Sequence, residues 1–266
     1  MGDKTQTHRL QQDLPYGRSS YVYLSLKPIG TILIFVHGFG GSSGKTWRRF
    51  PELIIGNDAC AGCDIVFYGY ESMRTRSRFN AIALFEFLDQ VCTNPSPVLN
   101  PVSSPQSQRP RDFEFNRVVL ISHSLGGLIS RQALLEACNH KRDWLSRIGL
   151  VMFAPAHLGA DVFKLANAAF PVIGAILSFR WQSLLDLDPG GDTVARLQKD
   201  TAAQISNGKD SLIAKKVVLG DRDNIVTPNS FLSDPSPKVL RGKDHFEVCK
   251  PTSSFRDPLD QLLGLL

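Results

Sequence analysis

A serine that could act as a nucleophile stands in the run "RVVLISHSLGG" at 117–127, between a β-branched stretch and a stretch with helix-like apolar spacing. A sharp turn from strand to helix pushes a serine hydroxyl out above a sheet, and it requires small residues two before and two after the serine. Around Ser124 these residues are Ser122 and Gly126, so the usual G-x-S-x-G becomes S-H-S-L-G. With Ser122 as the nucleophile, the bulky Leu120 would occupy one of the two places. The pattern therefore predicts Ser124 as the nucleophile.

A serine hydroxyl is a weak nucleophile, so it needs a base, and the base needs an acid to orient it. Two strand-like runs downstream, at 215–220 and 237–242, are followed by Asp221 and Asp223 and by His245. Loops at the carboxyl ends of parallel strands meet at one edge of the sheet. The chain order of serine, aspartate and histidine is the order expected of such a site. Acid and base are therefore predicted to meet the nucleophile there.

The run "HGFGGSSGKT" at 37–46 resembles both a phosphate-binding loop and a turn that stabilises an oxyanion. A Walker A loop, G-x-x-x-x-G-K-[ST], needs its first glycine five residues before Gly44. That position is Phe39, which argues against nucleotide binding. The alternative needs only backbone donors for the negative charge of a tetrahedral intermediate. We assign these donors to Phe39 and Leu125, with Gly40 as the substitute for Phe39.

Apolar runs alternate with helix-like runs along the whole chain. The strand candidates are 31–37, 63–70, 117–122, 148–155, 215–220 and 237–242, with 20–26 as an additional edge strand, and the helix candidates are 77–92, 125–138 and 255–266. This alternation predicts an α/β fold with a mainly parallel sheet and helices on both faces. We expect one domain over 1–266.

Two segments interrupt this alternation. Residues 93–112 are rich in Pro and Ser and are predicted to form a long exposed loop. Residues 156–210 form an insertion whose apolar centre is broken by Pro171 and Gly174. A helical hairpin packed on the core and a helical cap over a substrate pocket are both compatible with this insertion. We predict the cap, with apolar faces turned toward an acyl chain.

Taken together, the runs "FVHGFGGSSGKTW", "SHSLGG", "FAPAHLGA", "GDRDNIVTP" and "DHFEVCKP" resemble the alpha/beta-hydrolase superfamily over about residues 25–260. They are most similar to its lipase-like serine esterase branch, which includes GPI inositol-deacylase-like and serine-active-site-containing proteins. The resemblance implies the alpha/beta-hydrolase fold and an acid three residues after the Gly of a G-x-x-D-x-x-V pattern. Here that acid is Asp223 rather than Asp221, and His245 matches the catalytic histidine of the branch.

Three further histidines lie within these motifs and are grouped as candidate substrate-site residues. His37 precedes the oxyanion turn, where bracing of loops is the expected role. His123 lies inside the serine turn, with its side chain expected to point away from that of the nucleophile. The resemblance gives His157, in "PAHLG", a role in shaping the site.

Composition limits the partners. The net charge of +5 is mild and the basic residues are scattered, so no nucleic-acid partner is expected. The sequence shows neither a secretory signal nor a membrane-spanning run, and its five cysteines favour a reduced, cytoplasmic compartment. Cys60 and Cys63 form a C-x-x-C without a second pair at zinc-site spacing, so ordinary thiols are the default and no metal or other cofactor is expected. Peripheral membrane contact and a place within a larger protein stay open.

The expected function is hydrolysis of carboxylic esters, with a small-molecule acyl ester or lipid as substrate, through an acyl-enzyme intermediate. A thioesterase, an amidase or a peptidase would use the same three residues. A catalytically silent binding or scaffolding module would keep the fold alone.

Overall fold

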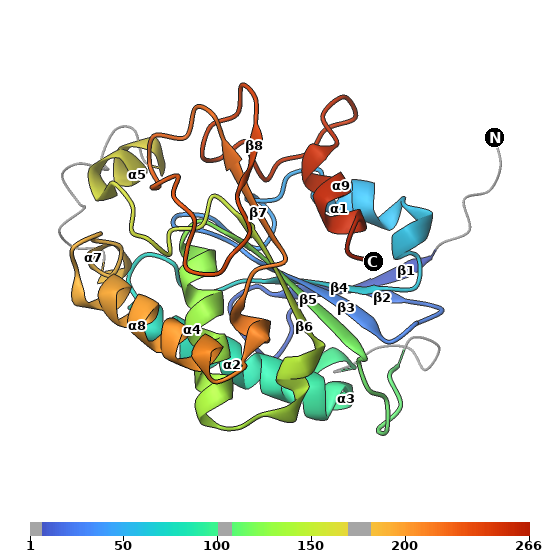
Figure 1. Cartoon of the computed structure of the whole chain (residues 1–266). Helices are drawn as coiled ribbons and strands as arrows, with labels where there is room; N and C mark the ends of the chain where they lie inside the picture. Colours follow the sequence, from blue (N-terminus) through green and yellow to red (C-terminus); the bar gives the residue numbers. More distant parts are fainter. Residues whose placement is uncertain (1–6, 101–107, 170–181) are drawn as a thin grey trace.

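An eight-stranded sheet forms the centre of the computed structural model, which describes residues 7–100, 108–169 and 182–266 (Figure 1). The strands are β1 (His8–Gln11), β2 (Tyr21–Ser25), β3 (Thr31–Val36), β4 (Asp64–Tyr68), β5 (Arg117–His123), β6 (Ile148–Phe153), β7 (Lys216–Gly220) and β8 (Lys238–Leu240). Their order is β1-β2-β4-β3-β5-β6-β7-β8. The pairs β1–β2 and β2–β4 are antiparallel, and all pairs from β4 to β8 are parallel. The prediction of a mainly parallel sheet is confirmed.

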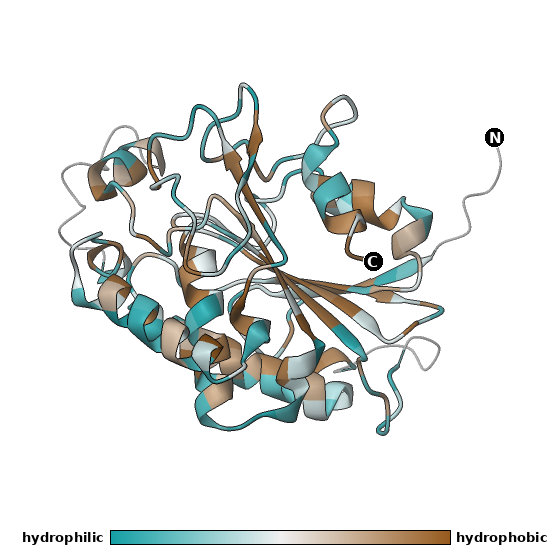
Figure 2. Cartoon of the chain, viewed as in Figure 1, coloured by the Kyte–Doolittle hydropathy of each residue, from teal (hydrophilic) through white to brown (hydrophobic). Residues whose placement is uncertain are grey.

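The central strands are mainly apolar because helices cover both faces of the sheet. Every residue of β3 and β4 is buried, and so is every residue of β5 after Arg117. Figure 2 shows this as continuous hydrophobic colour along the middle of the sheet. Strands buried on both faces have such runs instead of the alternation of a half-exposed strand. The nearly continuous apolar runs in the sequence therefore indicate that these strands are covered on both faces.

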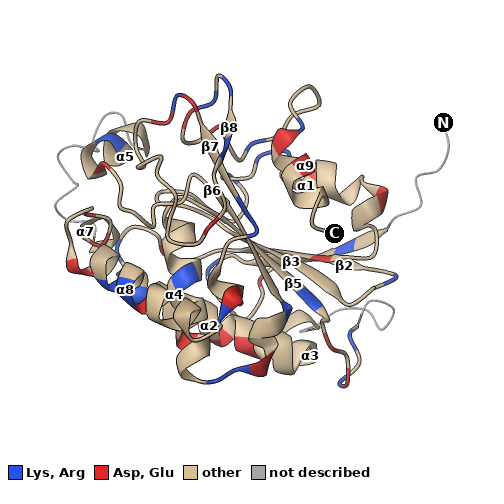
Figure 3. Ribbon diagram, viewed as in Figure 1, with Lys and Arg blue, Asp and Glu red and all other residues tan. Residues whose placement is uncertain are grey.

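Two sets of helices form the outer layers (Figure 1). One set consists of α1 (Phe50–Ile55) and α9 (Asp257–Leu263), and the other of α2 (Ser77–Thr93), α4 (Leu125–Asn139) and α8 (Asp192–Ser206). Shorter helices are α3 (Pro95–Leu99), α5 (Val162–Ala169) and α7 (Gln182–Leu185), with 3-10 turns at Asp58–Cys60, Asp143–Arg147 and Asp210–Leu212. Acidic and basic residues both occur along α2, α4 and α8 (Figure 3). None of the helices in the described parts of the chain has the length and apolar character needed to cross a membrane.

The prediction of an edge strand at 20–26 is wrong in its position. Strand β2 occupies this segment, but β1 pairs with it on one side and β4 on the other. The edge is β1, whose sequence "HRLQ" has no β-branched residue. The backbone pairing with β2 is what stabilises this strand. A strand that is so short and polar has no periodic apolar pattern by which the sequence could predict it.

The prediction of a long exposed loop at 93–112 is also wrong in part. Residues 95–99 form α3, in which Pro95 stands at a helix start and three residues are buried. Arg109 is 3% exposed and donates from Nε to Asp64 Oδ2 at 2.8 Å. The Pro- and Ser-rich composition hid both features. Residues 101–107 lie outside the described part of the chain.

The insertion at 156–210 contains α5, α7 and α8. Helix α8 packs against α4 and therefore belongs to the layer that covers the sheet. Helix α5 lies apart from this layer, whereas α7 lies next to the start of α8 (Figure 1). Asp186, which follows α7, accepts from the N–H of Ser77 at the start of α2 at 2.8 Å. The apolar centre of the predicted cap, at 170–181, lies outside the described residues. A role of α5 and α7 as a cap stays a prediction.

All five cysteines are free and buried. Burial raises the pKa of Cys60 to about 12 and that of Cys63 to about 11. Metal binding and thiol exchange both need the thiolate. Both thiols are therefore protonated near pH 7, which disfavours thiol exchange by the C-x-x-C.

Candidate functional site

Ser124 stands at the turn between β5 and α4 in a conformation that side chains rarely adopt. Its φ is 53° and its ψ is −123°. Such a backbone persists only where its surroundings fix it. The N–H of Ser124 donates to Phe153 O at 3.0 Å, and its carbonyl accepts from the N–H groups of Gly127 at 2.9 Å and Ala156 at 3.1 Å. Strand β6 and the loop after it therefore hold the backbone of the serine turn in place.

Close packing explains why the turn needs a glycine two residues after the serine. A Cβ atom on Gly126 would lie 2.4 Å from Val36 O and 2.5 Å from His37 O. Both atoms belong to the backbone at the end of β3, so neither can move without displacing the strand. On the other side, Ser122 is fully buried, and its hydroxyl lies 3.5 Å from Val151 O. The small side chains are thus a consequence of how closely β3, β5 and α4 approach each other.

The structure brings the predicted nucleophile, base and acid together. His245 Nε2 lies 2.8 Å from Ser124 Oγ, and His245 Nδ1 lies 2.9 Å from Asp223 Oδ2. A neutral imidazole with its proton on Nδ1 donates to the carboxylate and accepts from the hydroxyl. Ser124 and His245 are each 1% exposed, so bulk water does not screen these contacts.

Asp223 is held as an ionised carboxylate by donors on both oxygens. Its Oδ1 accepts from the N–H groups of Ile225 at 2.9 Å and Val226 at 3.3 Å. Burial opposes the charged form, but the hydrogen bond from His245 and these two backbone donors outweigh it, and the pKa of Asp223 is lowered. The competing Asp221 is exposed and accepts from Gly242 N at 2.6 Å. The geometry agrees with the choice of Asp223 over Asp221.

The loop that follows β3 lies directly on the nucleophile. A Cβ on Gly38 would be 2.8 Å from Ser124 Cβ, which brings the predicted oxyanion turn into contact with the reacting residue. Leu125 is the first residue of α4, where an N–H has no partner within its own helix. The N–H of Gly40 already donates to Ser72 Oγ at 3.1 Å. The choice of Phe39 or Gly40 as the second donor stays a prediction.

His37 braces this loop through both of its ring nitrogens. Nδ1 donates to Gly38 O at 2.8 Å, and Nε2 accepts from the Tyr70 N–H at 3.3 Å. The Tyr70 hydroxyl donates to His37 O at 2.7 Å, and the two rings stack with centroids 4.2 Å apart. Burial lowers the pKa of His37 to about 4, which keeps the ring neutral. The His37 ring therefore holds the loop in place through its hydrogen bonds, which is the role expected from its position before the turn.

The other two candidate histidines differ in their surroundings. The Nε2 of His123 lies 2.8 Å from His245 O. That the ring points away from the Ser124 side chain stays a prediction. His157 is buried with its ring centroid 4.3 Å from that of Phe231, and its Nδ1 has no partner among the described residues. Direct contact of these histidines with a substrate stays a prediction.

A buried ion pair behind the site escapes sequence reasoning. Arg131 on α4 pairs with Asp234, which lies in the segment between the acid and β8, and both side chains are at most 1% exposed. The guanidinium lies 4.3 Å from the Phe231 ring centroid, and Asp234 Oδ1 accepts from Ala214 N at 2.8 Å. These contacts attach the segment that follows Asp223 to the helix that follows Ser124. No local pattern marks either residue, because their separation in sequence is large.

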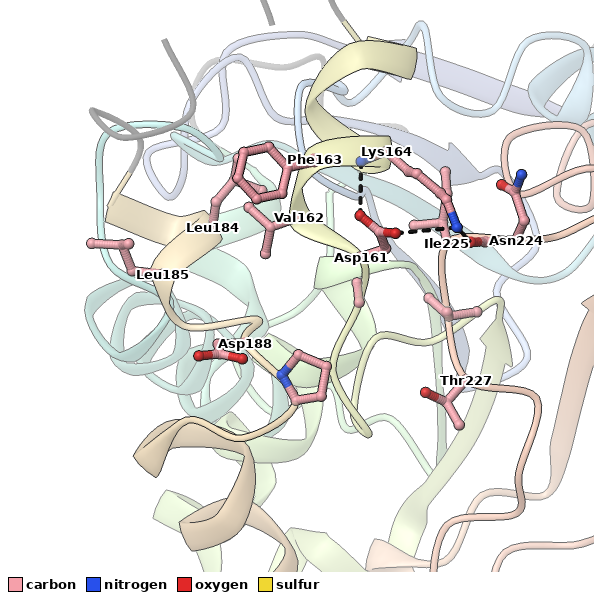
Figure 4. A pocket seen from close by; sticks show the side chains of 13 residues that line it. Asp161, Val162, Phe163, Lys164, Leu184, Leu185, Asp188, Asn224, Ile225 and Thr227 are labelled. Atoms are coloured by element: carbon pink, nitrogen blue, oxygen red, sulfur yellow. Dashed lines mark hydrogen bonds and ion pairs between the residues drawn. The ribbon is translucent and has the colours of Figure 1, made fainter. Parts of the chain in front are cut away.

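A pocket of about 680 Å³ opens beside the acid, between α5, α7 and the segment after β7 (Figure 4). Its wall is largely apolar, and the side chains that make it so include Val162, Phe163, Leu184, Leu185 and Ile225. The side chains of Asp161 and Lys164 form an ion pair at 3.1 Å within it. Ile225 and Val226 line the pocket and donate their N–H groups to Asp223. The lining does not include Ser124 or His245, so the pocket adjoins the site from the side of the acid.

Residues 33–261 match the model of the alpha/beta hydrolase family. The chain belongs to this family, and the sheet order and the serine turn described above agree with its fold. No curated protein matches the chain by sequence.

Several solved structures share this fold. Lipase BlEst2 of Bacillus licheniformis in its mature form has a TM-score of 0.58 at 17% identity, covering 96% of this chain and 97% of that one. The peroxisomal alpha-beta-hydrolase Lpx1 of Saccharomyces cerevisiae has a TM-score of 0.57 at 13% identity, covering 98% and 90%. Esterase B of Lactobacillus rhamnosis, solved with a tributyrin phosphonate, has a TM-score of 0.54 at 16% identity, covering 98% and 85%. At these identities the likeness concerns the fold alone.

Proposed function

We propose that this protein is a serine hydrolase that cleaves carboxylic esters with an apolar acyl group. The observation that carries the proposal is the position of His245, whose two ring nitrogens lie 2.8 Å from Ser124 Oγ and 2.9 Å from Asp223 Oδ2. A nucleophile, a base in contact with it and an oriented acid are the three parts needed for acyl transfer.

In the proposed mechanism Ser124 Oγ attacks the ester carbonyl while His245 Nε2 takes its proton. Asp223 stays ionised, stabilises the imidazolium through Nδ1–H and keeps the ring in the right tautomer. The tetrahedral intermediate collapses, and the alcohol leaves with the proton from Nε2. Water then attacks the acyl-enzyme with His245 again as the base, which restores the free hydroxyl.

The developing oxyanion needs donors that are fixed before the reaction. The N–H groups of Leu125 and Phe39 are the proposed pair. The first belongs to the N-terminus of α4, where the helix dipole also favours negative charge. The second belongs to the loop that Gly38 brings against the nucleophile. Loss of one comparable donor costs about 100- to 1000-fold in turnover.

The proposed substrate class rests on the pocket beside the acid. Apolar side chains from α5 and α7 dominate its wall, which suits an acyl chain better than a charged or peptide group. Two structurally similar proteins, BlEst2 and Esterase B, are a lipase and an esterase by name.

Turnover of p-nitrophenyl esters of graded chain length tests this proposal. The expected result is hydrolysis that improves with acyl length, and a loss of at least about 1000-fold in kcat for Ser124→Ala. Ser130→Ala is the matched control, because Ser130 is fully buried on α4, the helix that follows Ser124, and its hydroxyl has no partner among the described residues. Undiminished turnover by a folded Ser124→Ala protein would disprove the proposal.

A further inference from the structure

The ring of His123 reaches the backbone of the proposed base. His123 directly precedes the nucleophile, yet its Nε2 lies 2.8 Å from His245 O. The two imidazole centroids are 5.1 Å apart, and the side chains are 3% and 1% exposed. A hydrogen bond within the protein therefore joins the serine turn to the loop that carries His245.

This bond fixes the tautomer of His123. A carbonyl oxygen only accepts, so Nε2 carries the proton and donates it. Burial, followed by the nearby His245, lowers the pKa of His123 to about 3, and the ring is neutral near pH 7. Nδ1 then carries a lone pair, and this atom has no hydrogen-bond partner among the described residues. A Cβ on Gly38 would lie 2.9 Å from this atom, so the loop with the proposed oxyanion donor packs against the same ring.

The loop that carries His245 is attached to the segment of the acid by the N–H of Arg222, which donates to Lys243 O at 3.0 Å. It follows β8, a strand of three residues. On the far side of His245, Asp244 Oδ1 accepts from the N–H groups of Phe246 at 2.9 Å and Glu247 at 2.8 Å. These bonds shape the turn itself but do not attach it to the nucleophile. The bond from His123 attaches the backbone of His245 to the residue before the nucleophile, beside the contact of the His245 ring with Ser124 Oγ.

We infer that His123 is a positioning residue that fixes the backbone of His245 and so sets the distance from the base to Ser124. The inference deepens the proposed function and rests on it for its kinetic consequences. A misplacement of about 1 Å is enough to cost on the order of 100-fold in rate. A residue that acts only through packing would affect stability without this specific effect on kcat.

Two substitutions separate the hydrogen bond from the volume of the ring. His123→Gln keeps an N–H donor at a reach similar to that of Nε2, whereas His123→Leu fills the space without a donor. The matched control is His8→Leu. His8 is also buried, at 4% exposed, and its Nε2 lies 2.9 Å from a backbone carbonyl, that of Cys63, but it lies on the edge strand β1.

The measurements are kcat and KM for a p-nitrophenyl ester, together with the far-downfield NMR signal of the proton shared by His245 Nδ1 and Asp223. We expect His123→Leu to lower kcat about 10- to 100-fold with little change in KM and to shift or broaden that signal. His123→Gln should recover most of the rate and the signal. His8→Leu should lower the Tm while both readouts stay unchanged.

Unchanged kcat and an unchanged signal in His123→Leu would overturn the inference, and so would a His123→Gln protein no better than His123→Leu. If His123→Leu does not fold, His123→Asn replaces it, because its amide is too short to reach the carbonyl. The NMR signal needs no substrate. Failure of the proposed esterase activity would therefore be distinguishable from failure of this positioning role.

Discussion

Asp223 contacts His245 through one carboxylate oxygen and the backbone of its own loop through the other. Oδ2 lies 2.9 Å from His245 Nδ1, while Oδ1 accepts from the N–H groups of Ile225 and Val226. The acid is therefore fixed by its loop before it orients the base. The same two residues line the pocket beside the site, so the wall of that pocket and the orientation of the base share one segment of backbone.

The first prediction concerns the choice between the two aspartates that follow β7. Asp223→Asn should lower kcat by about 10⁴-fold, because the amide favours the wrong tautomer of His245. Asp221→Asn is the control and should stay within a few-fold of the wild type, since Asp221 contacts Gly242 at the exposed surface. Steady-state kinetics of the two variants decide the matter. A larger loss of kcat in Asp221→Asn than in Asp223→Asn would show that Asp221 is the acid and that the assignment to Asp223 is wrong.

The second prediction concerns the glycine after the nucleophile. Gly126→Ala places a methyl group against Val36 O and His37 O, so it should destabilise the fold by about 1–3 kcal/mol or more and displace the serine turn. Gly44→Ala should change stability by less than about 0.5 kcal/mol, because the nearest atom to its added Cβ is 4.0 Å away. Urea unfolding measures both. Equal stability of the two variants would contradict the packing described here.

The third prediction is a loss of stability in acid. Burial lowers the pKa of His37 to about 4 and that of His123 to about 3, well below the ordinary value near 6.5. The unfolded chain then binds more protons than the folded protein at any pH between these values, so stability decreases as the pH falls. The contribution is complete above about pH 6.5 and is lost progressively down to about pH 4 and then pH 3.

Urea unfolding at several pH values between 7.5 and 4.5 measures this dependence. His123→Gln removes one of the buried histidines whose pKa is lowered, so it should flatten the decline. A free energy of unfolding that stays constant over this range, or a decline as steep in His123→Gln as in the wild type, would show that these rings do not resist protonation.

The fourth prediction concerns the buried ion pair between α4 and the segment after the acid. Asp234→Ala leaves the Arg131 guanidinium buried without its partner, which should cost about 3–5 kcal/mol of stability. Glu52→Ala is the control, since its pair with Arg49 is exposed on both sides and should contribute less than about 1 kcal/mol. Thermal or urea unfolding distinguishes the two. Similar costs would mean that the buried pair is not an anchor.

The sequence was sufficient to predict the parts of the site that depend on local pattern. Ser124 is marked by the small residues around it, and Asp223 and His245 by their places after apolar strands. Burial on both faces gives those strands runs that the sequence reveals directly. The parallel sheet then brings their ends together, so the order along the chain predicted the meeting of the three side chains.

Features that depend on distant partners could not be predicted in this way. Strand β1 exists because β2 offers it hydrogen bonds, and its own residues carry no strand pattern. Arg109 lies in a segment that looks like an exposed loop, yet Asp64 on β4 draws it into the interior. The contact of His123 with the His245 backbone joins residues that are 122 positions apart. Each of these depends on tertiary structure rather than on local propensity.

The most direct measurement of the central claim is covalent labelling by a fluorophosphonate probe, with the modified residue located by mass spectrometry. The account predicts one label, on Ser124, formed at a rate that His245→Gln lowers by at least about 1000-fold while the protein remains folded. The Ser130→Ala control should label like the wild type. A folded protein that is not labelled, or one labelled at another serine, would contradict the account.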